Sequence, residues 1–145
     1  MPALHRLLPA LVLCGLCALV TPALAAPKLT PSAPLKAYKG PEGELIIMVE
    51  VNDGAEMLVQ FKNIGGPFEG KALLYLVDDQ GKGRKDVYVD KKRGSKTYRS
   101  YVLSLRDGTW ELYHPGKPGT HFSLRYSEAA SEKLKIDDVL KAYQP

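Results

Sequence analysis

Short apolar segments, separated by Gly, Asn, Asp and Pro every few residues, run through most of the chain. Such segments at close spacing are typical of antiparallel β structure, in which each turn reverses the chain. The pattern predicts strands at residues 45–51, 55–62, 72–77, 85–90, 97–105, 109–114 and 120–126. The expected fold is therefore mainly β, an antiparallel sandwich or a small barrel of about seven strands with one C-terminal helix.

A helical pattern follows the last predicted strand. Ser127 suits an N-cap position, and Glu128 follows it in the first turn. An apolar stripe with spacing i, i+3, i+4 and i+7 consists of Ile136, Val139, Leu140 and Tyr143. We therefore expect a helix over residues 128–143, with a break near Asp137, that packs on the sheet or across an open end of it.

Turn chemistry predicts the register of the first hairpin. A three-residue loop that ends at Gly54 would place six apolar residues on one face, whereas a two-residue loop would mix apolar and polar residues. The pairs expected from the longer loop are Val49 with Met57, Ile47 with Val59, and Leu45 with Phe61. This register also places Glu50 opposite Glu56, which is a mildly unfavourable pair of like charges.

Residues 7–20 form a separate apolar stretch without a charged side chain. His5 and Arg6 precede it, and Ala23-Leu24-Ala25 follows, so the three parts of a secretory signal are present. The stretch is shorter than the roughly 20 residues that a membrane-spanning helix needs, which disfavours an uncleaved anchor. The predicted organisation is a cleavable signal peptide (1–25), a Pro-rich extended segment (26–43) and a single β-rich domain (44–145), without a transmembrane span after cleavage.

Both cysteines, Cys14 and Cys17, lie inside this predicted leader. Cleavage would leave a chain without disulfides or thiol chemistry, and the sequence contains no Asn-x-Ser/Thr glycosylation site. Export without either feature is more typical of a bacterial protein than of a eukaryotic one. The expected location is the periplasm or the medium.

Two loops resemble ligand-binding motifs only in part. Gly65–Lys71 has the spacing of a phosphate-binding loop, but Ala72 replaces the hydroxyl residue, and the following residues indicate a strand instead of a helix. Asp78–Gly83 resembles a calcium loop, but Lys82 places a cation where a ligand is needed. We interpret both segments as connections between strands and assign no cofactor.

Histidines and carboxylates are the remaining candidates for chemistry. A five-residue loop pairs Leu112 with Phe122 in the last hairpin and sets His114 and His121 on opposite faces, which disfavours a shared metal ion. We therefore assign no catalytic residue and no metal ligand. A hydrolytic pair of convergent carboxylates stays open among Glu42, Glu44, Glu50, Glu56 and Glu69.

The most uneven feature is charge, because residues 82–106 carry nine Lys or Arg residues against two Asp residues. If Lys91 and Lys96 close the turn, Tyr88 lies across from Arg99, within reach of a cation–π contact. One interpretation is a solvated hairpin whose charges prevent edge aggregation. The other is a docking element for an anionic partner, with contacts from Lys85, Lys91, Lys92, Arg93, Lys96 and Arg99.

These observations favour a non-catalytic binding or structural module over an enzyme. The partner would be an anionic envelope component, such as lipid head groups or an acidic glycan, or an acidic protein; predicted export argues against nucleic acid. The alternatives are a small secreted enzyme inhibitor that presents loop 91–96 and a small hydrolase. A protruding loop would favour the inhibitor, and a pocket with convergent titratable groups would favour the enzyme.

Overall fold

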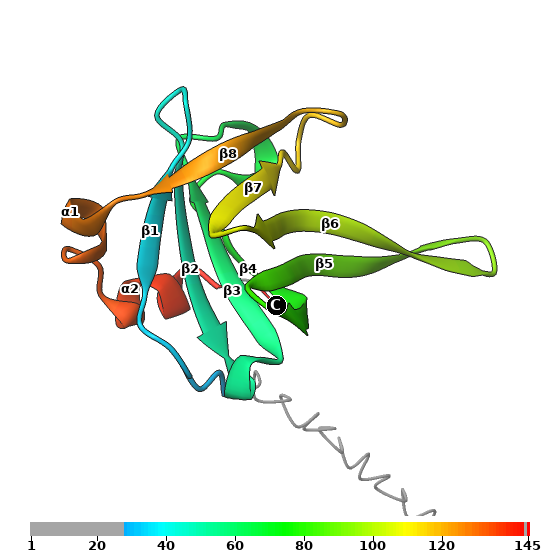
Figure 1. Ribbon diagram of the computed structural model, residues 1–145, viewed down its shortest axis with the longest axis horizontal. Helices are drawn as coiled ribbons and strands as arrows, with labels where there is room; N and C mark the ends of the chain where they lie inside the picture. Colours follow the sequence, from blue (N-terminus) through cyan, green and yellow to red (C-terminus); the bar gives the residue numbers. More distant parts are fainter. Residues whose placement is uncertain (1–27, 144) are drawn as a thin grey trace, which may run out of the picture.

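The chain forms a closed barrel of eight antiparallel strands, in which each strand pairs with its neighbours in sequence and β1 pairs with β8 (Figure 1). The computed structural model describes residues 28–143 and 145, so the predicted leader and its cysteines lie outside the described residues. The strands are β1 (Lys36–Lys39), β2 (Leu45–Val51), β3 (Glu56–Lys62), β4 (Ala72–Gly81), β5 (Arg84–Arg93), β6 (Lys96–Arg106), β7 (Thr109–Tyr113) and β8 (His121–Tyr126). Two short 3₁₀ helices, η1 (Asn52–Gly54) and η2 (Gly66–Phe68), follow β2 and β3. The prediction of a mainly β fold with a small barrel is confirmed.

The strand that the sequence pattern did not predict is β1, which lies within the Pro-rich segment. Ala37 pairs with Ile47 of β2, and Tyr38 pairs with Tyr126 of β8, so this short strand closes the barrel. Pro34 and Pro41 flank it and leave too few residues for a visible alternation. The barrel therefore begins before residue 44 and has eight strands, where the sequence pattern predicted about seven.

Two apolar clusters lie on opposite faces of the β2–β3 hairpin. The first fills the barrel and includes Ile46, Met48, Phe61, Leu103 and Leu112. The second covers the outer face and joins Val49 and Leu58 to Val139 of the C-terminal region. Burial on both faces explains why residues 45–51 form a nearly continuous apolar run instead of alternating.

The predicted register of this hairpin is wrong by one residue. Met48 lies opposite Val59, and Glu50 lies opposite Met57, because the connection contains four residues, Asn52 to Ala55. Asn52, Asp53 and Gly54 all have positive φ, so two non-glycine residues take the left-handed conformation. The predicted register assumed that only one face of the hairpin is apolar. Both faces are buried, so this criterion does not distinguish the two registers.

The C-terminal region contains two short helices, α1 (Glu128–Ser131) and α2 (Ile136–Lys141), instead of the one predicted helix. The break lies before α2, where Lys135 is extended, and not at Asp137. Leu134 and Val139 both pack on the outer cluster, and one continuous helix would place residues five apart on different faces. The Ser131 hydroxyl accepts a hydrogen bond from the Ala37 amide at 2.9 Å and so ties α1 to β1. Within the described residues, neither helix is long and apolar enough to cross a membrane.

Candidate functional site

The β5–β6 hairpin extends beyond the barrel as a two-stranded ribbon (Figure 1). Strand β4 pairs with β5 only as far as Tyr88, and β7 pairs with β6 only from Leu103 toward its C-terminal end. The two hairpin strands stay paired to Arg93 and Lys96, joined by Gly94 and Ser95. Gly94 has a φ of +63°, which this tight turn requires and glycine adopts without strain.

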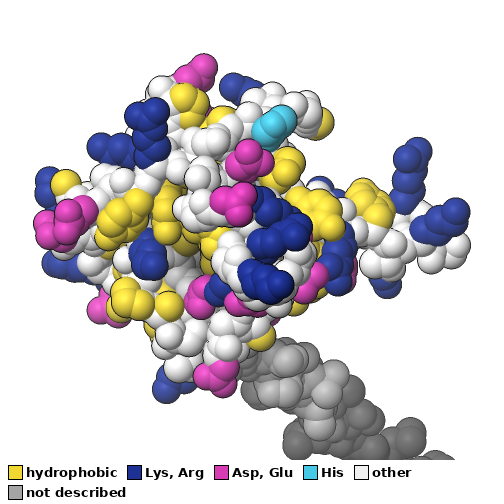
Figure 2. All heavy atoms as spheres, in the orientation of Figure 1, with side chains coloured by type: hydrophobic (Ala, Val, Ile, Leu, Met, Phe, Trp, Pro, Cys, Tyr) yellow, Lys and Arg dark blue, Asp and Glu magenta, His cyan; other side chains and the backbone are white. Residues whose placement is uncertain are grey.

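Four exposed cations occupy the end of this ribbon, which we call the hairpin tip (residues 91–96). Figure 2 shows Lys and Arg side chains at the outer end of the hairpin and hydrophobic side chains nearer its base. Within the part of the chain that the structure describes, none of these four forms an ion pair. They are Lys91, Lys92, Arg93 and Lys96.

At the base of the hairpin, Lys85 behaves differently from the tip cations. Its Nζ lies 2.6 Å from Glu50 Oε1 of β2 and 3.2 Å from Asp79 Oδ2 of β4. Strands β2 and β5 are not neighbours, so this ion pair spans the barrel at its end away from the hairpin tip. The hydrogen bond to Glu50 raises the pKa of Lys85 despite partial desolvation. Lys85 is therefore engaged by two carboxylates of the protein itself, unlike the tip cations.

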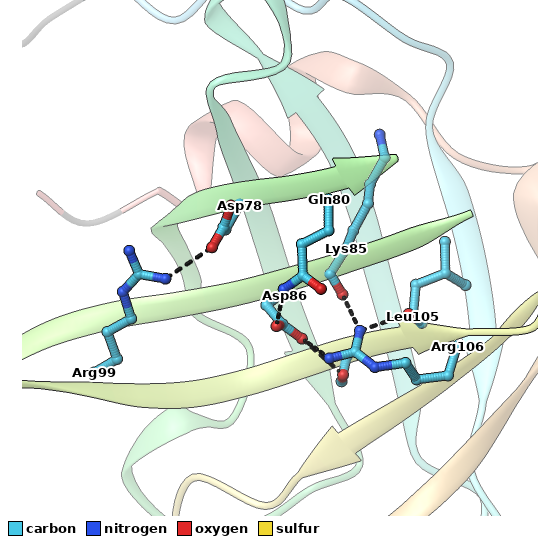
Figure 3. Close-up of polar contacts among 8 residues, drawn as sticks. Asp78, Gln80, Lys85, Asp86, Arg99, Leu105 and Arg106 are labelled. Atoms are coloured by element: carbon cyan, nitrogen blue, oxygen red, sulfur yellow. Dashed lines mark hydrogen bonds and ion pairs between the residues drawn. The ribbon is translucent and has the colours of Figure 1, made fainter. Parts of the chain in front are cut away.

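Arg106 is neutralised by a network on the outer face of β4, β5 and β6 (Figure 3). Its guanidinium lies 2.6 Å from Asp86 Oδ1, and Asp86 also accepts hydrogen bonds from Ser104 and Gln80, each at 2.8 Å. Burial of Asp86 opposes ionisation, but these hydrogen bonds and the Arg106 charge outweigh it, so the pKa of Asp86 is lowered. The network joins the three strands within the barrel, toward the ends of β5 and β6 that lie away from the hairpin tip.

Arg99 also has partners within the protein, although it lies further along the ribbon. Its guanidinium carbon lies 4.3 Å from the centre of the Tyr88 ring, and Nη1 lies 2.8 Å from Asp78 Oδ2 (Figure 3). The predicted contact with Tyr88 is confirmed, but the predicted register is wrong, since Tyr88 lies opposite Tyr101. The contact is diagonal, because Gly94-Ser95 alone forms the turn and the register set by this turn runs unbroken from Arg93 to Tyr88.

A pocket of about 780 Å³, which we call the mouth pocket, lies where the hairpin leaves the barrel. Its apolar wall comes from β4, β5 and β6 and includes Leu73, Tyr75, Val89 and Val102, which also belong to or pack on the barrel core. Burial raises the pKa of Tyr75 to about 12, so this phenol stays neutral in ordinary buffers. The pocket rim adds Lys91, Tyr98, Tyr101, Tyr113, His114, His121 and Tyr143.

Both histidines border the mouth pocket, although sequence reasoning placed them on opposite faces of their hairpin. The predicted pairing is confirmed, with His121 opposite Tyr113 and the amide of His114 bonded to Thr120. The loop brings the rings to one rim: His114 Nδ1 accepts a hydrogen bond from the Gly116 amide, and His121 stacks on Tyr113. Among the described residues, no group of three or more His, Cys, Asp or Glu side chains could hold a metal ion.

The glycine-rich connection at residues 65–71 binds its own carboxylate. Glu69 accepts hydrogen bonds from the backbone amides of Asn63, Ile64 and Gly65 at 2.8–2.9 Å. These amides, that of Gly65 first, lower the pKa of Glu69. The following strand begins at Ala72, as predicted. Within the motif, the amides of Glu69, Gly70 and Lys71 donate to backbone carbonyl groups and so are not free to bind a phosphate.

The other candidate acidic groups also have local structural partners. Asp79 accepts a hydrogen bond from the Gly81 amide at 2.9 Å, which is turn geometry and not a calcium loop. Glu44 accepts one from the Glu42 amide, and Asn52 donates one to Glu56. Glu44, Glu50, Glu56 and Glu69 thus have separate partners, and none of the five candidate glutamates is among the described residues that line the mouth pocket.

Comparison of the chain with family models, curated proteins and solved structures gives no significant match. The case for function therefore rests on the geometry of the hairpin and of the mouth pocket.

Proposed function

We propose that this protein is an exported, non-catalytic binding module that docks on an anionic lipid surface through the hairpin tip. One observation carries the proposal: three cations nearer the barrel, Lys85, Arg99 and Arg106, have acidic partners, whereas the four cations at the projecting tip have none in the described chain. Exposed cations without ion pairs have little effect on the stability of the domain, and their charge is available to a partner.

The arrangement of the tip suits a diffuse anionic surface better than a folded acidic protein. Side chains alternate along a strand, so Lys91 and Arg93 lie on one face of the ribbon and Lys92 lies on the other. A folded protein partner would contact only one face of the ribbon, through charges arranged to complement its own. Tyr98, which is 48% exposed and paired with Lys91, adds an amphipathic ring of the kind that favours the interfacial region of a bilayer.

The expected size of the effect follows from membrane electrostatics. Each Lys or Arg near an anionic leaflet contributes about 1 kcal/mol, so four cations contribute about 4 kcal/mol, or roughly 1,000-fold in partitioning. The attraction falls off within a Debye length of about 10 Å at 0.1 M salt. A projecting ribbon brings its charges within that distance before the barrel itself reaches the surface.

Vesicle co-sedimentation tests the proposal. A variant with Lys92, Arg93 and Lys96 changed to Gln should bind vesicles of phosphatidylglycerol and phosphatidylcholine about 100-fold more weakly than the wild type, since three charges are lost. A matched control with Lys28, Lys133 and Lys135 changed to Gln has the same net charge and should lose much less. Equal losses in the two variants, or equal binding to pure phosphatidylcholine, would refute specific docking through the tip.

The inhibitor alternative has one observation in its favour, the projecting loop that it requires. An inhibitor would bind an enzyme through this loop, whereas the proposed module would bind a lipid surface. If anionic vesicles do not bind the wild type at low salt, the membrane proposal fails and an acidic protein becomes the next candidate. The carboxylate hydrolase has no comparable support, because no Asp or Glu appears among the described residues that line the mouth pocket.

A further inference from the structure

We infer that the mouth pocket binds a small anionic amphiphile, with its apolar body against the barrel mouth and its anionic group beside Lys91. The inference goes beyond docking through the hairpin tip, because it concerns one molecule in a pocket and not a surface. It rests on three features of the pocket: its apolar wall, the charge of its rim and the exposed rings around it.

The wall and size of the pocket fit the apolar part of such a ligand. Small-molecule sites usually measure about 300–1,000 Å³ and are lined mainly by hydrophobic and aromatic side chains. The mouth pocket, at about 780 Å³, lies in that range, and its wall includes Leu73, Val89 and Val102. Below it the barrel is filled by buried side chains, including Phe61 and Leu103. A ligand would therefore occupy the mouth and would not thread through the barrel.

The charge of the rim predicts the sign of the head group. The described lining residues contain one lysine, two histidines and no Asp or Glu. Lys91 has no ion pair within the described chain, so its charge is available to a ligand. An anionic head group would gain a charge-assisted hydrogen bond there, whereas a cationic one would be repelled.

The exposed aromatic rings at the pocket rim support the inference independently of the apolar wall and the rim charge. Five large hydrophobic side chains are exposed among the described residues, and three of them, Tyr98, Tyr101 and Tyr113, border this pocket. Exposed aromatic surface that gathers around a concavity is typical of a binding site. The tyrosine hydroxyls can stay in water while the rings cover the ligand.

Competition binding in solution, without vesicles, tests the inference. The full chain should bind the fluorescent anionic amphiphile 8-anilinonaphthalene-1-sulfonate at a single site, and decanoate should displace it. Decyltrimethylammonium, which has an alkyl chain of similar length and the opposite charge, should not displace it at the same concentration. Equal displacement by the two amphiphiles would overturn the predicted preference for an anion.

Two pairs of variants locate the site. Lys91→Gln should weaken decanoate binding about fivefold, the size expected for one partly exposed charge, whereas Lys92→Gln, on the opposite face of the ribbon, should leave it unchanged. Ser100→Trp, which fills the pocket opposite Val89, should abolish binding, with Ser95→Trp in the tip turn as its control. Equal effects of the two lysine changes would overturn the site, even if Ser100→Trp fails to fold. The triple tip variant retains Lys91, so loss of its vesicle binding with unchanged decanoate binding would separate this inference from the proposed function.

Discussion

The two ends of one basic segment differ in what surrounds their charges. Lys85, Arg99 and Arg106, which lie nearer the barrel, contact acidic residues, whereas the tip residues 91–96 project beyond every other strand. The partner acids come from β2, β4 and β5; pairing of β4, β5 and β6 sets Asp78 and Asp86 near Arg99 and Arg106, and the curved sheet brings Glu50 of β2 to Lys85. Composition alone treats both ends alike, so a local excess of charge does not show which charges are free.

The largest difference in stability should appear at Asp86. Asp86→Asn removes the carboxylate that accepts from Gln80, Ser104 and Arg106, and it turns an amide N–H toward donors. We expect the free energy of unfolding to fall by about 2 kcal/mol, the usual cost of losing hydrogen bonds to a buried charge. Urea denaturation measures this loss.

Asp90→Asn serves as the matched control, because Asp90 is an exposed carboxylate further along the same strand. Its effect should stay within about 0.5 kcal/mol, as for most surface substitutions. Equal destabilisation by the two changes would show that the Asp86 network does not stabilise the barrel.

The stability contributed by Asp86 should depend on pH in a defined direction. Its folded pKa is lowered, so the contribution is complete above the ordinary value of 3.8 and is lost as the pH falls through the lower folded value. The difference in stability between wild type and Asp86→Asn should therefore shrink on acidification. Urea midpoints at pH 6 and pH 2.5 test this, and a difference that stays constant would contradict the assigned ionisation.

A smaller loss is expected for Lys85. Lys85→Gln breaks ion pairs with Glu50 and Asp79 that are partly open to solvent, so screening limits the expected loss to about 1 kcal/mol. Lys82→Gln, an exposed residue of the preceding turn, is the control and should leave the thermal midpoint nearly unchanged. If the two substitutions lower the thermal midpoint equally, the ion pair between Lys85 and Glu50 makes no net contribution to stability.

The smallest effect on stability should come from the tip itself. Changing Lys91, Lys92, Arg93 and Lys96 to Gln should alter the free energy of unfolding by no more than about 0.5 kcal/mol, because these side chains are exposed and lack partners in the described chain. Urea denaturation alongside Asp86→Asn makes the contrast direct. A loss as large as that of Asp86→Asn would mean that the tip has a structural role and would weaken the proposed function.

Much of the architecture was predictable from local patterns. Turn residues located every strand from β2 to β8, and the loop 115–119 gave the correct pairing of Leu112 with Phe122. Strand β1 was missed because prolines flank a strand too short to show alternation. The β2–β3 register was missed because Ile47 and Met48 are both buried, on opposite faces, and burial on both sides removes the polar signal.

The candidate site was predictable only in part, for a related reason. The contact of Arg99 with Tyr88 follows from strand pairing, which is short in range. The pairing of Lys85 with Glu50 joins residues 35 apart and exists because the sheet closes on itself. The mouth pocket likewise depends on closure, since its walls come from three strands and the β7–β8 loop.

Lysine footprinting on vesicles tests the central claim most directly. Acetylation of the full chain, measured by mass spectrometry for each lysine, should be slowed by phosphatidylglycerol vesicles at Lys91, Lys92 and Lys96 and should stay unchanged at Lys133 and Lys135. Vesicles of phosphatidylcholine should protect none of them. Uniform protection of all exposed lysines, or protection confined to residues 133 and 135, would contradict docking through the hairpin tip.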